Sequence, residues 1–411
     1  MKQLSVRELQ TRLAAADNPP VILDVREGWE LNICALPGAV HIPMGQIPNR
    51  LEELDPGRET VVVCHHGVRS LRVAHFLESR GFSKLYNLQG GVDAWARERS
   101  EVFGRAWLFL GHEAEAPAPG DWIATDVAGH RLLAVRGRDG LLRAFHNVCR
   151  HRAGPLVTGD RGNCGGELVC AYHGWRYALD GRLRAATGFG PAEGFDPREF
   201  GLLTLRLETW RGLVFATMDA DAAPLADHVA PLEALLARRG LAIAAPALRR
   251  SHDLACDWKT YAENYLEGYH IGSVHPVLAG ELGAAEYRVR VEGDLVLQEA
   301  VGVNDGPQAG VWGWLWPNLG INVYRDGAMI ERMTPVGPGR TRLDYLFLND
   351  GGEGALGESL AASDRLTAED AAICEAVQRN LSAGAYDHGV LSPDHELALA
   401  WFQSRIAEVH P

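Results

Sequence analysis

Two short pairs of potential metal ligands, each with one cysteine and one histidine, constrain the middle of the chain most. Cys149 and His151 form a Cys-x-His pair, and Cys170 and His173 form a Cys-x-x-His pair after a gap of 18 residues. A zinc finger instead pairs cysteine with cysteine at one end and histidine with histidine at the other. Mixed pairs suit a [2Fe-2S] cluster in which two cysteines hold one iron and two histidines hold the other. We expect such a cluster, with zinc as the alternative.

The residues around these pairs resemble the Rieske motif. The matching stretches are Cys149-Arg-His-Arg-Ala-Gly-Pro-Leu156 and Cys170-Ala-Tyr-His-Gly-Trp175, and Leu179-Asp-Gly-Arg182 has the composition of a hairpin turn. The resemblance implies an all-β Rieske [2Fe-2S] domain, which we expect over residues 101–215, with Cys149, His151, Cys170 and His173 as cluster ligands. Cys164 lies between the two pairs at neither ligand spacing, and we interpret it as a bystander.

A second group of potential ligands lies between Asp257 and Pro276. Glu267 and His270 are three residues apart and would share one face of a helix, whereas His275 would point about 140° away from His270. Gly272 and Pro276 favour a break that lets both imidazoles converge. Two histidines and one carboxylate, with positions left open, form the ligand set of oxygen-activating iron. The stretch predicts an iron site; the alternative is two ordinary polar histidines near a helix end.

We expect the third ligand of that site on the predicted helix over residues 363–381. At about 100° per residue, Asp370 falls within the apolar face of this helix, whereas Glu369 lies at its edge. The other members of the face are Leu366, Ile373, Cys374, Val377 and Leu381. A carboxylate in an apolar stripe needs a positive partner, and a metal would provide one. We therefore predict Asp370 as the ligand; the alternative is a first-turn acid favoured by the helix dipole.

From Trp107 to the C-terminus the chain resembles the α subunit, or terminal oxygenase, of a Rieske non-haem iron oxygenase. The resemblance implies that His270, His275 and Asp370 bind mononuclear non-haem Fe(II) in an α+β helix-grip (START-like) catalytic domain, expected over residues 216–411. It also implies a homotrimer in which the cluster of one subunit feeds the iron of the next. Glu267 would then bridge His173 of one subunit and His270 of the next and gate electron flow.

Two features narrow the expected substrate. Family members that dihydroxylate rings usually have aspartate at the Glu267 position, whereas the glutamate here is similar to members that attack carnitine. The tail from Asp370 to Glu396 also resembles the choline and glycine-betaine oxidising branch. Aromatic residues suit a cation, and the candidates are Trp312, Trp314, Trp316 and Tyr324, with sheet core as their alternative role. We expect O2-dependent hydroxylation or N-demethylation of a small methylated or quaternary amine. An aromatic or sulfur-containing substrate, or a sulfurtransferase or redox protein, are the alternatives.

The first 100 residues predict an α/β domain of another kind. A capping-box helix is expected from Ser5 to Leu13, and Val21–Asp24 and Thr60–Val63 read as buried strands. Cys64 follows the second strand and precedes a helix near Ser70, so loop amides, a helix N-terminus and Arg69 would stabilise an anionic sulfur. This segment resembles a single-domain rhodanese, through Leu23–Glu27, His41–Pro43, Cys64–Arg69 and Asn87–Trp95. Cys64 would then carry sulfane sulfur, unless it is a structural cysteine in a domain kept for assembly or regulation.

Composition sets the remaining expectations. With 411 residues, 46% of them hydrophobic, the chain suits two or three domains, and a net charge of −13 argues against a nucleic-acid partner. We expect a cytoplasmic protein without membrane contact, because the N-terminus lacks an apolar signal core and no uncharged apolar run of about 18 residues follows. The chain contains no Gly-x-Gly-x-x-Gly fingerprint, so a separate NAD(P)H-dependent reductase or a ferredoxin would supply electrons.

Overall fold

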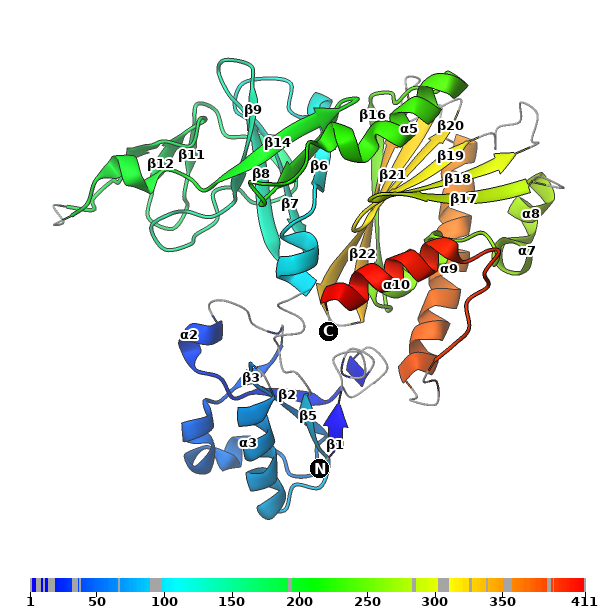
Figure 1. Cartoon of the computed structure of the whole chain (residues 1–411). Coiled ribbons are helices and arrows are strands. Elements are labelled where there is room, and N and C mark those ends of the chain that lie inside the picture. Colours follow the sequence, from blue (N-terminus) through cyan, green and yellow to red (C-terminus); the bar gives the residue numbers. More distant parts are fainter. Residues whose placement is uncertain are drawn as a thin grey trace.

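The computed structural model describes the whole chain apart from short segments. The residues outside the description are 1, 5–8, 10–11, 14–18, 32–35, 37, 66, 89–97, 191–193, 283–285, 302–309, 325–326, 338, 350–356, 383–385, 387 and 410–411. Three β-rich units follow one another along the chain (Figure 1). No helix within the described part is long and apolar enough to cross a membrane.

The N-terminal unit contains a five-stranded sheet with the order β1-β5-β4-β2-β3, in which every pair is parallel. Its strands are β1 (Lys2–Leu4), β2 (Val21–Asp24), β3 (Val40–His41), β4 (Thr60–Val63) and β5 (Leu85–Leu88), and its helices include α2 (Gly28–Leu31), η1 (Met44–Asn49), η2 (Leu51–Glu53) and α3 (Val68–Ser79). Both predicted strands are confirmed. Most of the predicted helix from Ser5, and residues 89–95 of the last matching stretch, lie outside the described residues.

The middle unit is antiparallel throughout. A seven-stranded sheet has the order β10-β7-β8-β9-β14-β15-β6, and a smaller one has the order β11-β12-β13. The strands are β6 (Leu108–His112), β7 (Asp121–Val127), β8 (His130–Arg136), β9 (Leu142–His146), β10 (Arg161–Asn163), β11 (Glu167–Val169), β12 (Arg176–Ala178), β13 (Leu183–Ala185), β14 (Thr204–Trp210) and β15 (Leu213–Thr217). The predicted hairpin turn joins β12 to β13, where Gly181 has a φ of +87° that glycine adopts without strain. Short helices η3 (Glu98–Phe103), η4 (Glu113–Glu115) and η5 (Pro197–Phe200) complete this unit.

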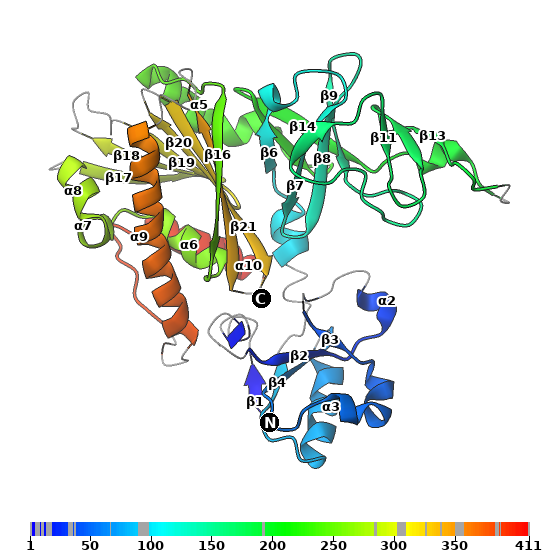
Figure 2. The ribbon, with the colours of Figure 1, turned by 180° about the vertical axis from the view of Figure 1, so that it is seen from behind.

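The C-terminal unit is a seven-stranded antiparallel sheet with the order β16-β22-β21-β20-β19-β18-β17. Its strands are β16 (Pro246–Leu254), β17 (Glu286–Glu292), β18 (Leu295–Val301), β19 (Val311–Leu315), β20 (Leu319–Tyr324), β21 (Gly327–Gly337) and β22 (Arg340–Leu348). The helices are α5 (Leu225–Arg239), α6 (Trp258–Tyr265), α7 (Ile271–Val274), α8 (Pro276–Leu282), α9 (Gly357–Ser382) and α10 (Leu397–Val409). Figure 2 shows α9 running across the sheet, which is the predicted helix-grip arrangement.

Side chains of this last sheet alternate between two environments, as the strand period requires. Leu297 and Ile321 belong to a core shared with Leu232 and Leu236 of α5. Their neighbours in sequence, Gln298 and Asn322, instead line a cavity on the other face of the sheet. One face of the sheet is therefore closed by α5, and the opposite face carries polar and aromatic groups around the cavity.

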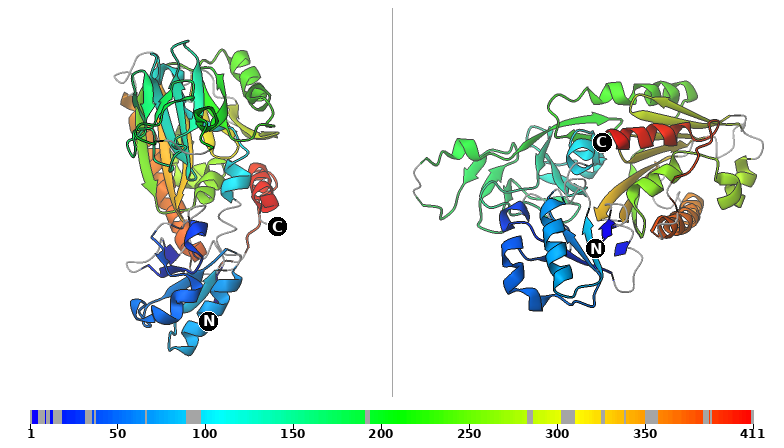
Figure 3. Two further views of the ribbon diagram at one scale, coloured as in Figure 1. Left: turned by 90° about the vertical axis from the view of Figure 1, so that its left-hand side faces the viewer. Right: turned by 60° about the horizontal axis from the view of Figure 1, so that its bottom comes forward.

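The middle and C-terminal units share a core, whereas the N-terminal sheet stands apart from both. Phe103 and Leu108 of the middle unit pack in one cluster with Trp258 and Phe402. Arg249 at the start of the last sheet also forms a bidentate ion pair with Glu115. Figure 3 shows the two larger sheets together and the N-terminal unit below them.

Candidate metal centres and thiol site

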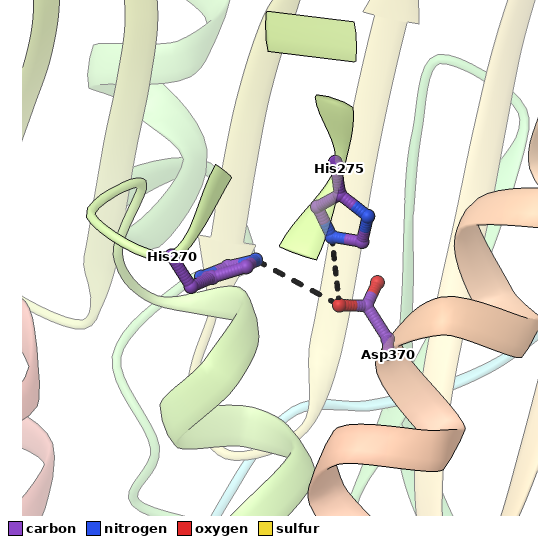
Figure 4. Close-up of side chains that lie close together, drawn as sticks. All are labelled: His270, His275 and Asp370. Atoms are coloured by element: carbon purple, nitrogen blue, oxygen red, sulfur yellow. Dashed lines mark hydrogen bonds and ion pairs between the residues drawn. The ribbon is translucent and has the colours of Figure 1, made fainter. Parts of the chain in front are cut away.

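His270, His275 and Asp370 come together in the C-terminal unit (Figure 4). Each offers a ligand atom, and these atoms lie within 4.8 Å of one another. The Asp370 Oδ1 atom is 3.0 Å from His275 Nε2 and 3.7 Å from His270 Nε2. His275 is 3% exposed and Asp370 18%, so the carboxylate and both imidazoles meet largely away from solvent. Two imidazoles and one carboxylate facing a common point are the donor set of non-haem iron with open coordination positions.

The helix carrying this site breaks earlier than the sequence indicated. Helix α6 ends at Tyr265, residues 266–270 form a turn, and the short α7 then separates His270 from His275. A second break follows at His275, and α8 begins at Pro276, as predicted for that proline. We predicted that Gly272 would permit the break, and this is wrong: Gly272 lies inside α7 with open space around it. Gly268 is the constrained position, because a Cβ there would lie 2.4 Å from the Tyr287 ring. The close approach of that ring to the turn therefore requires glycine.

Carboxylates hold the two imidazoles from behind, and an amide binds the Asp370 oxygen that faces them. His270 Nδ1 lies 2.6 Å from Glu267 Oε1, and His275 Nδ1 lies 2.7 Å from Glu369 Oε2. Asn264 Nδ2 donates to Asp370 Oδ1 at 2.7 Å. Because each ring uses Nδ1 for a carboxylate, its Nε2 is left directed at the common point. This is the usual arrangement by which a second layer of residues fixes the tautomer and orientation of metal-binding histidines.

The face of α9 that points inward differs in part from the predicted one. Asp370 faces the two histidines as expected, and Thr367, Cys374 and Gln378 are buried on the same side. Ile373 and Val377 were expected in this stripe, but they are 37% and 39% exposed. The buried stripe is thus displaced toward polar residues, and the two aliphatic side chains lie on the surface of this chain.

A cavity of about 250 Å³ opens from the three-residue group between the sheet and α9. Trp312 and Tyr324 line it as predicted, whereas Trp314 and Trp316 are wrong as lining residues, because both pack in the core. Further aromatic walls come from residues that the sequence analysis did not single out: Tyr261, Tyr265, Tyr287, Tyr345 and Phe347. Two buried carboxyl groups, Glu331 and Glu267, also line the cavity.

The two cysteine–histidine pairs meet between the hairpins of the middle unit. Cys149 and Cys170 are 2% and 1% exposed, and the rings of His151 and His173 lie 4.5 Å apart between centroids. Backbone hydrogen bonds close both loops, from Cys149 N to the Gly154 carbonyl and from Cys170 N to the Trp175 carbonyl. The two pairs, which 18 residues separate in sequence, therefore form one site at the end of the molecule marked by β11 and β12 (Figure 1).

The donor set and its surroundings fit a [2Fe-2S] cluster. His151 Nδ1 is buried and has no hydrogen-bond partner among the described residues, as expected of a nitrogen that is reserved for a metal. The Trp175 ring stacks on His151 at 4.8 Å and holds its plane. The Tyr177 hydroxyl lies 3.2 Å from Cys149 Sγ, and such contacts to cluster sulfurs tune the reduction potential. A Cβ at Gly154 would come within 2.9 Å of Cys170 Sγ, so only glycine leaves the thiol its space.

In one chain the two candidate metal sites lie far apart. The cysteine–histidine loops flank β11 at one end of the molecule, and α7 and α9 lie at the other (Figures 1 and 2). Each site has exposed aromatic residues beside it: Tyr172 next to His173, and Tyr269 next to His270. Tyr269 stacks on His395 with a centroid distance of 4.9 Å.

Cys64 occupies the predicted position at the carboxyl end of β4. Its Sγ atom accepts a hydrogen bond from Gly67 N at 3.1 Å. Ser70 Oγ also lies 3.2 Å from the sulfur, but its hydroxyl makes a shorter hydrogen bond of 2.6 Å to Asn87 Oδ1. Gly67 has a φ of +84° at the start of α3, which directs its amide at the sulfur. Arg69, which was expected to face the sulfur, forms a bidentate ion pair with Glu30, and this hydrogen bonding lowers the pKa of Glu30 to about 2.

Several residues that build these sites were missed by the sequence analysis. Glu369 was weighed only as a rival ligand to Asp370, yet it supports His275. Asn264, Tyr177 and Glu331 were not considered. For Glu331 a signal existed, because it occupies an inward position of β21 between Met329 and Met333, where an apolar residue is the norm.

Comparisons with known proteins agree with the order of these units. Family models match residues 5–98 as a rhodanese-like domain, 106–196 as a Rieske [2Fe-2S] domain and 242–410 as the catalytic domain of a ring-hydroxylating α subunit. The chain is 32% identical over 245 residues to the carnitine monooxygenase oxygenase subunit of Escherichia coli (strain K12), covering 56% of this chain and 64% of that protein. The match thus spans less than two thirds of that relative.

Two further similarities cover more of the chain. It is 29% identical to the chloroplastic choline monooxygenase of Arabidopsis thaliana, over 71% of this chain and 74% of that protein. A solved quaternary ammonium Rieske monooxygenase in complex with L-carnitine superposes with a TM-score of 0.66 at 27% identity, covering 77% of this chain and 92% of the other.

Proposed function

We propose that this chain, which belongs to the Rieske non-haem iron oxygenases and carries a rhodanese-like domain at its N-terminus, is a terminal oxygenase acting on a small methylated or quaternary amine. The observation that carries the proposal is the cavity beside His270, His275 and Asp370, whose walls are aromatic and include a carboxyl group. Aromatic faces attract ammonium groups. The similarity to carnitine and choline monooxygenases supports the same substrate class.

The proposed reaction inserts one oxygen atom into a C–H bond next to the substrate nitrogen. The second oxygen atom leaves as water, with two electrons from the reductase and two protons. A carbinolamine formed in this way loses formaldehyde, so the net result is N-demethylation. When bound, the cluster supplies the electrons and the iron supplies the centre at which O2 is reduced.

In this proposal each group of residues has a distinct task. Cys149, His151, Cys170 and His173 hold the cluster, supported by their burial and by the unpartnered His151 nitrogen. His270, His275 and Asp370 hold the iron, supported by their common focus. The aromatic walls hold the substrate and exclude water from it. We propose domain boundaries near residues 100 and 215.

We further propose a ring of three subunits that receives electrons from a separate reductase or ferredoxin in the cytoplasm. Glu267 contacts His270 Nδ1 with Oε1, and its Oε2 accepts hydrogen bonds from the backbone amides of Tyr269 and His270. In the ring, the cluster histidine of a neighbouring subunit would approach this same carboxylate. The separation of the two sites in one chain supports transfer between chains (Figure 1). The structure of a quaternary ammonium Rieske monooxygenase that is 27% identical to this chain gives insight into electron transfer between subunits of that protein.

For the N-terminal domain we propose sulfur transfer at Cys64. The hydrogen bond from Gly67 N supports this role, because it stabilises a negatively charged sulfur. Arg69 has a less direct part than a ligand to the sulfur would have, since its guanidinium is engaged by Glu30. The Arg69 guanidinium places a positive charge at the start of α3.

A single-turnover experiment tests the oxygenase proposal. The cluster is reduced chemically, O2 is added with methylated amines, aromatic acids or sulfur compounds in separate reactions, and products are identified by mass spectrometry. We expect a demethylated or hydroxylated amine in proportion to cluster oxidation. Oxidation accelerated only by a ring or a sulfur compound would move the substrate to that class, and no acceleration by any of them would contradict the oxygenase proposal.

A further inference from the structure

The carboxyl group of Glu331 has a place in the cavity that the proposed reaction does not use. It projects from β21 toward the space enclosed by the sheet and α9, and the residue is 4% exposed. Directly across the strand pair, Tyr345 donates a hydrogen bond from its hydroxyl to Glu331 Oε1 at 3.1 Å. Tyr261 and Asn322 also hydrogen-bond to this carboxyl group. All three partners are neutral.

Neutral donors orient a carboxylate but do not balance its charge. An ionised carboxylate in a buried site is costly unless an opposite charge meets it. Burial, reinforced by the negative charge of Asp370, raises the pKa of Glu331 to about 8. Tyr261, Tyr345 and Asn322 surround the group with polar atoms, yet the side of the carboxylate toward the cavity faces aromatic walls.

We propose that Glu331 is the specificity-determining residue for the substrate, the counter-charge that pairs with its ammonium group inside the aromatic cavity. The inference rests on the proposed function, because it assigns the residue that recognises the substrate class named there. Trp312, Tyr324 and Tyr287 supply ring faces for the methyl groups. Glu331 loses its proton to solvent when the ammonium group binds, and it then supplies the full negative charge that rings lack. Asp370 and Glu267 are committed to the histidines, which leaves Glu331 to the substrate.

The test compares a cation with its uncharged twin. Choline and 3,3-dimethyl-1-butanol have nearly the same shape, but the second has carbon in place of nitrogen. Binding of each to the full-length protein, loaded with its cluster and iron, is measured by isothermal titration calorimetry. We expect the protein to prefer choline, and Glu331→Gln to weaken choline binding at least about tenfold while leaving the neutral compound unchanged. Gln keeps the shape and the hydrogen-bonding oxygen.

Two further variants separate charge from structure. Glu299→Gln removes a carboxylate from the same sheet, where Glu299 pairs with Arg239 and Arg290 away from the cavity, and it should keep the preference for choline. Glu331→Asp keeps the charge but withdraws it by one methylene group, and its preference should be intermediate. Thermal melting of each variant identifies any that fail to fold.

The outcomes distinguish this inference from the proposal beneath it. A preference for choline that survives Glu331→Gln overturns the role of Glu331 and leaves the methylated-amine substrate standing. Equal weakening of both compounds shows that Glu331 only supports the cavity wall and also overturns the role. A protein that binds the neutral compound as well as choline contradicts the substrate class itself.

Discussion

Replacing Glu369 by glutamine should weaken iron binding although Glu369 is not a predicted ligand. Its Oε2 atom is 2.7 Å from His275 Nδ1, and His275 is almost fully buried, so this bond decides which nitrogen faces the metal. Losing such a supporting group usually lowers metal affinity about 10- to 100-fold, which corresponds to about 1.4 to 2.8 kcal/mol. Glutamine still accepts the Nδ1–H, so Glu369→Gln should fall near tenfold and Glu369→Ala near the upper limit.

The measurement is competition between the full-length protein and a coloured Fe(II) chelator, with the visible spectrum of the cluster monitored as a control for integrity. Asp370→Asn should lose iron more completely than either Glu369 variant, because it removes a ligand. Glu375→Gln is the matched control, since Glu375 lies on the same helix but accepts a hydrogen bond from Ala255 N.

Two results would refute this reasoning. If Glu369→Ala keeps iron as tightly as the parent protein while Asp370→Asn loses it, the bond to His275 does not position the ring. If Glu375→Gln loses as much iron as Glu369→Gln, the effect reflects the charge of α9 and not the bond.

Three further predictions concern the other sites. Tyr177→Phe should lower the reduction potential of the cluster, because it removes the hydroxyl 3.2 Å from Cys149 Sγ; voltammetry against exposed Tyr172→Phe measures this, and equal potentials would contradict it. The pKa of Asp294 is lowered to about 2, chiefly by a hydrogen bond from His228 and then by Arg405. A carboxylate with a lowered pKa stabilises the fold at pH values above the pKa that it has in the unfolded chain. Asp294→Asn should therefore lower the free energy of unfolding by roughly 2 kcal/mol at pH 5 and by progressively less as the pH falls from 4 to 2. Denaturant unfolding at these pH values checks the sign. Cys64→Ser should abolish sulfur transfer from thiosulfate and leave amine turnover unchanged. The control Cys164→Ser should be active in both assays, and loss of amine turnover in Cys64→Ser would show that the two activities are coupled.

Patterns within the chain predicted the architecture because each unit repeats a simple period. The buried strands Val21–Asp24 and Thr60–Val63 and the hairpin at Asp180–Gly181 are all confirmed. These features depend on residues that are close in sequence, and local composition suffices to recognise them.

The details of the candidate site escaped prediction because they depend on packing between distant segments. Both Gly268 and Gly272 suit a helix break, and only the Tyr287 ring from β17 makes Gly268 the constrained one. Helical periodicity selected Asp370 over Glu369 as the inward acid, but it carries no information on where the second nitrogen of His275 points. The three tryptophans Trp312, Trp314 and Trp316 also show what periodicity cannot predict. The strand period would place all three on one face of the sheet, but Trp312 lines the cavity whereas Trp314 and Trp316 lie deeper, in the core.

The difference between the predicted and the observed inward faces of α9 bears on the proposed trimer. Ile373 and Val377 carry the apolar pattern of a buried face, yet they are partly exposed, and they line a surface groove together with Glu267. Val390, on the segment after α9, lines the same groove and is 95% exposed. These apolar side chains surround the Glu267 carboxylate, which is proposed to face the cluster of the neighbouring subunit. A contact between subunits would cover such an apolar surface. In the proposed ring the next subunit would bury Ile373 and Val377, and the apolar pattern of α9 would then reflect a contact between subunits.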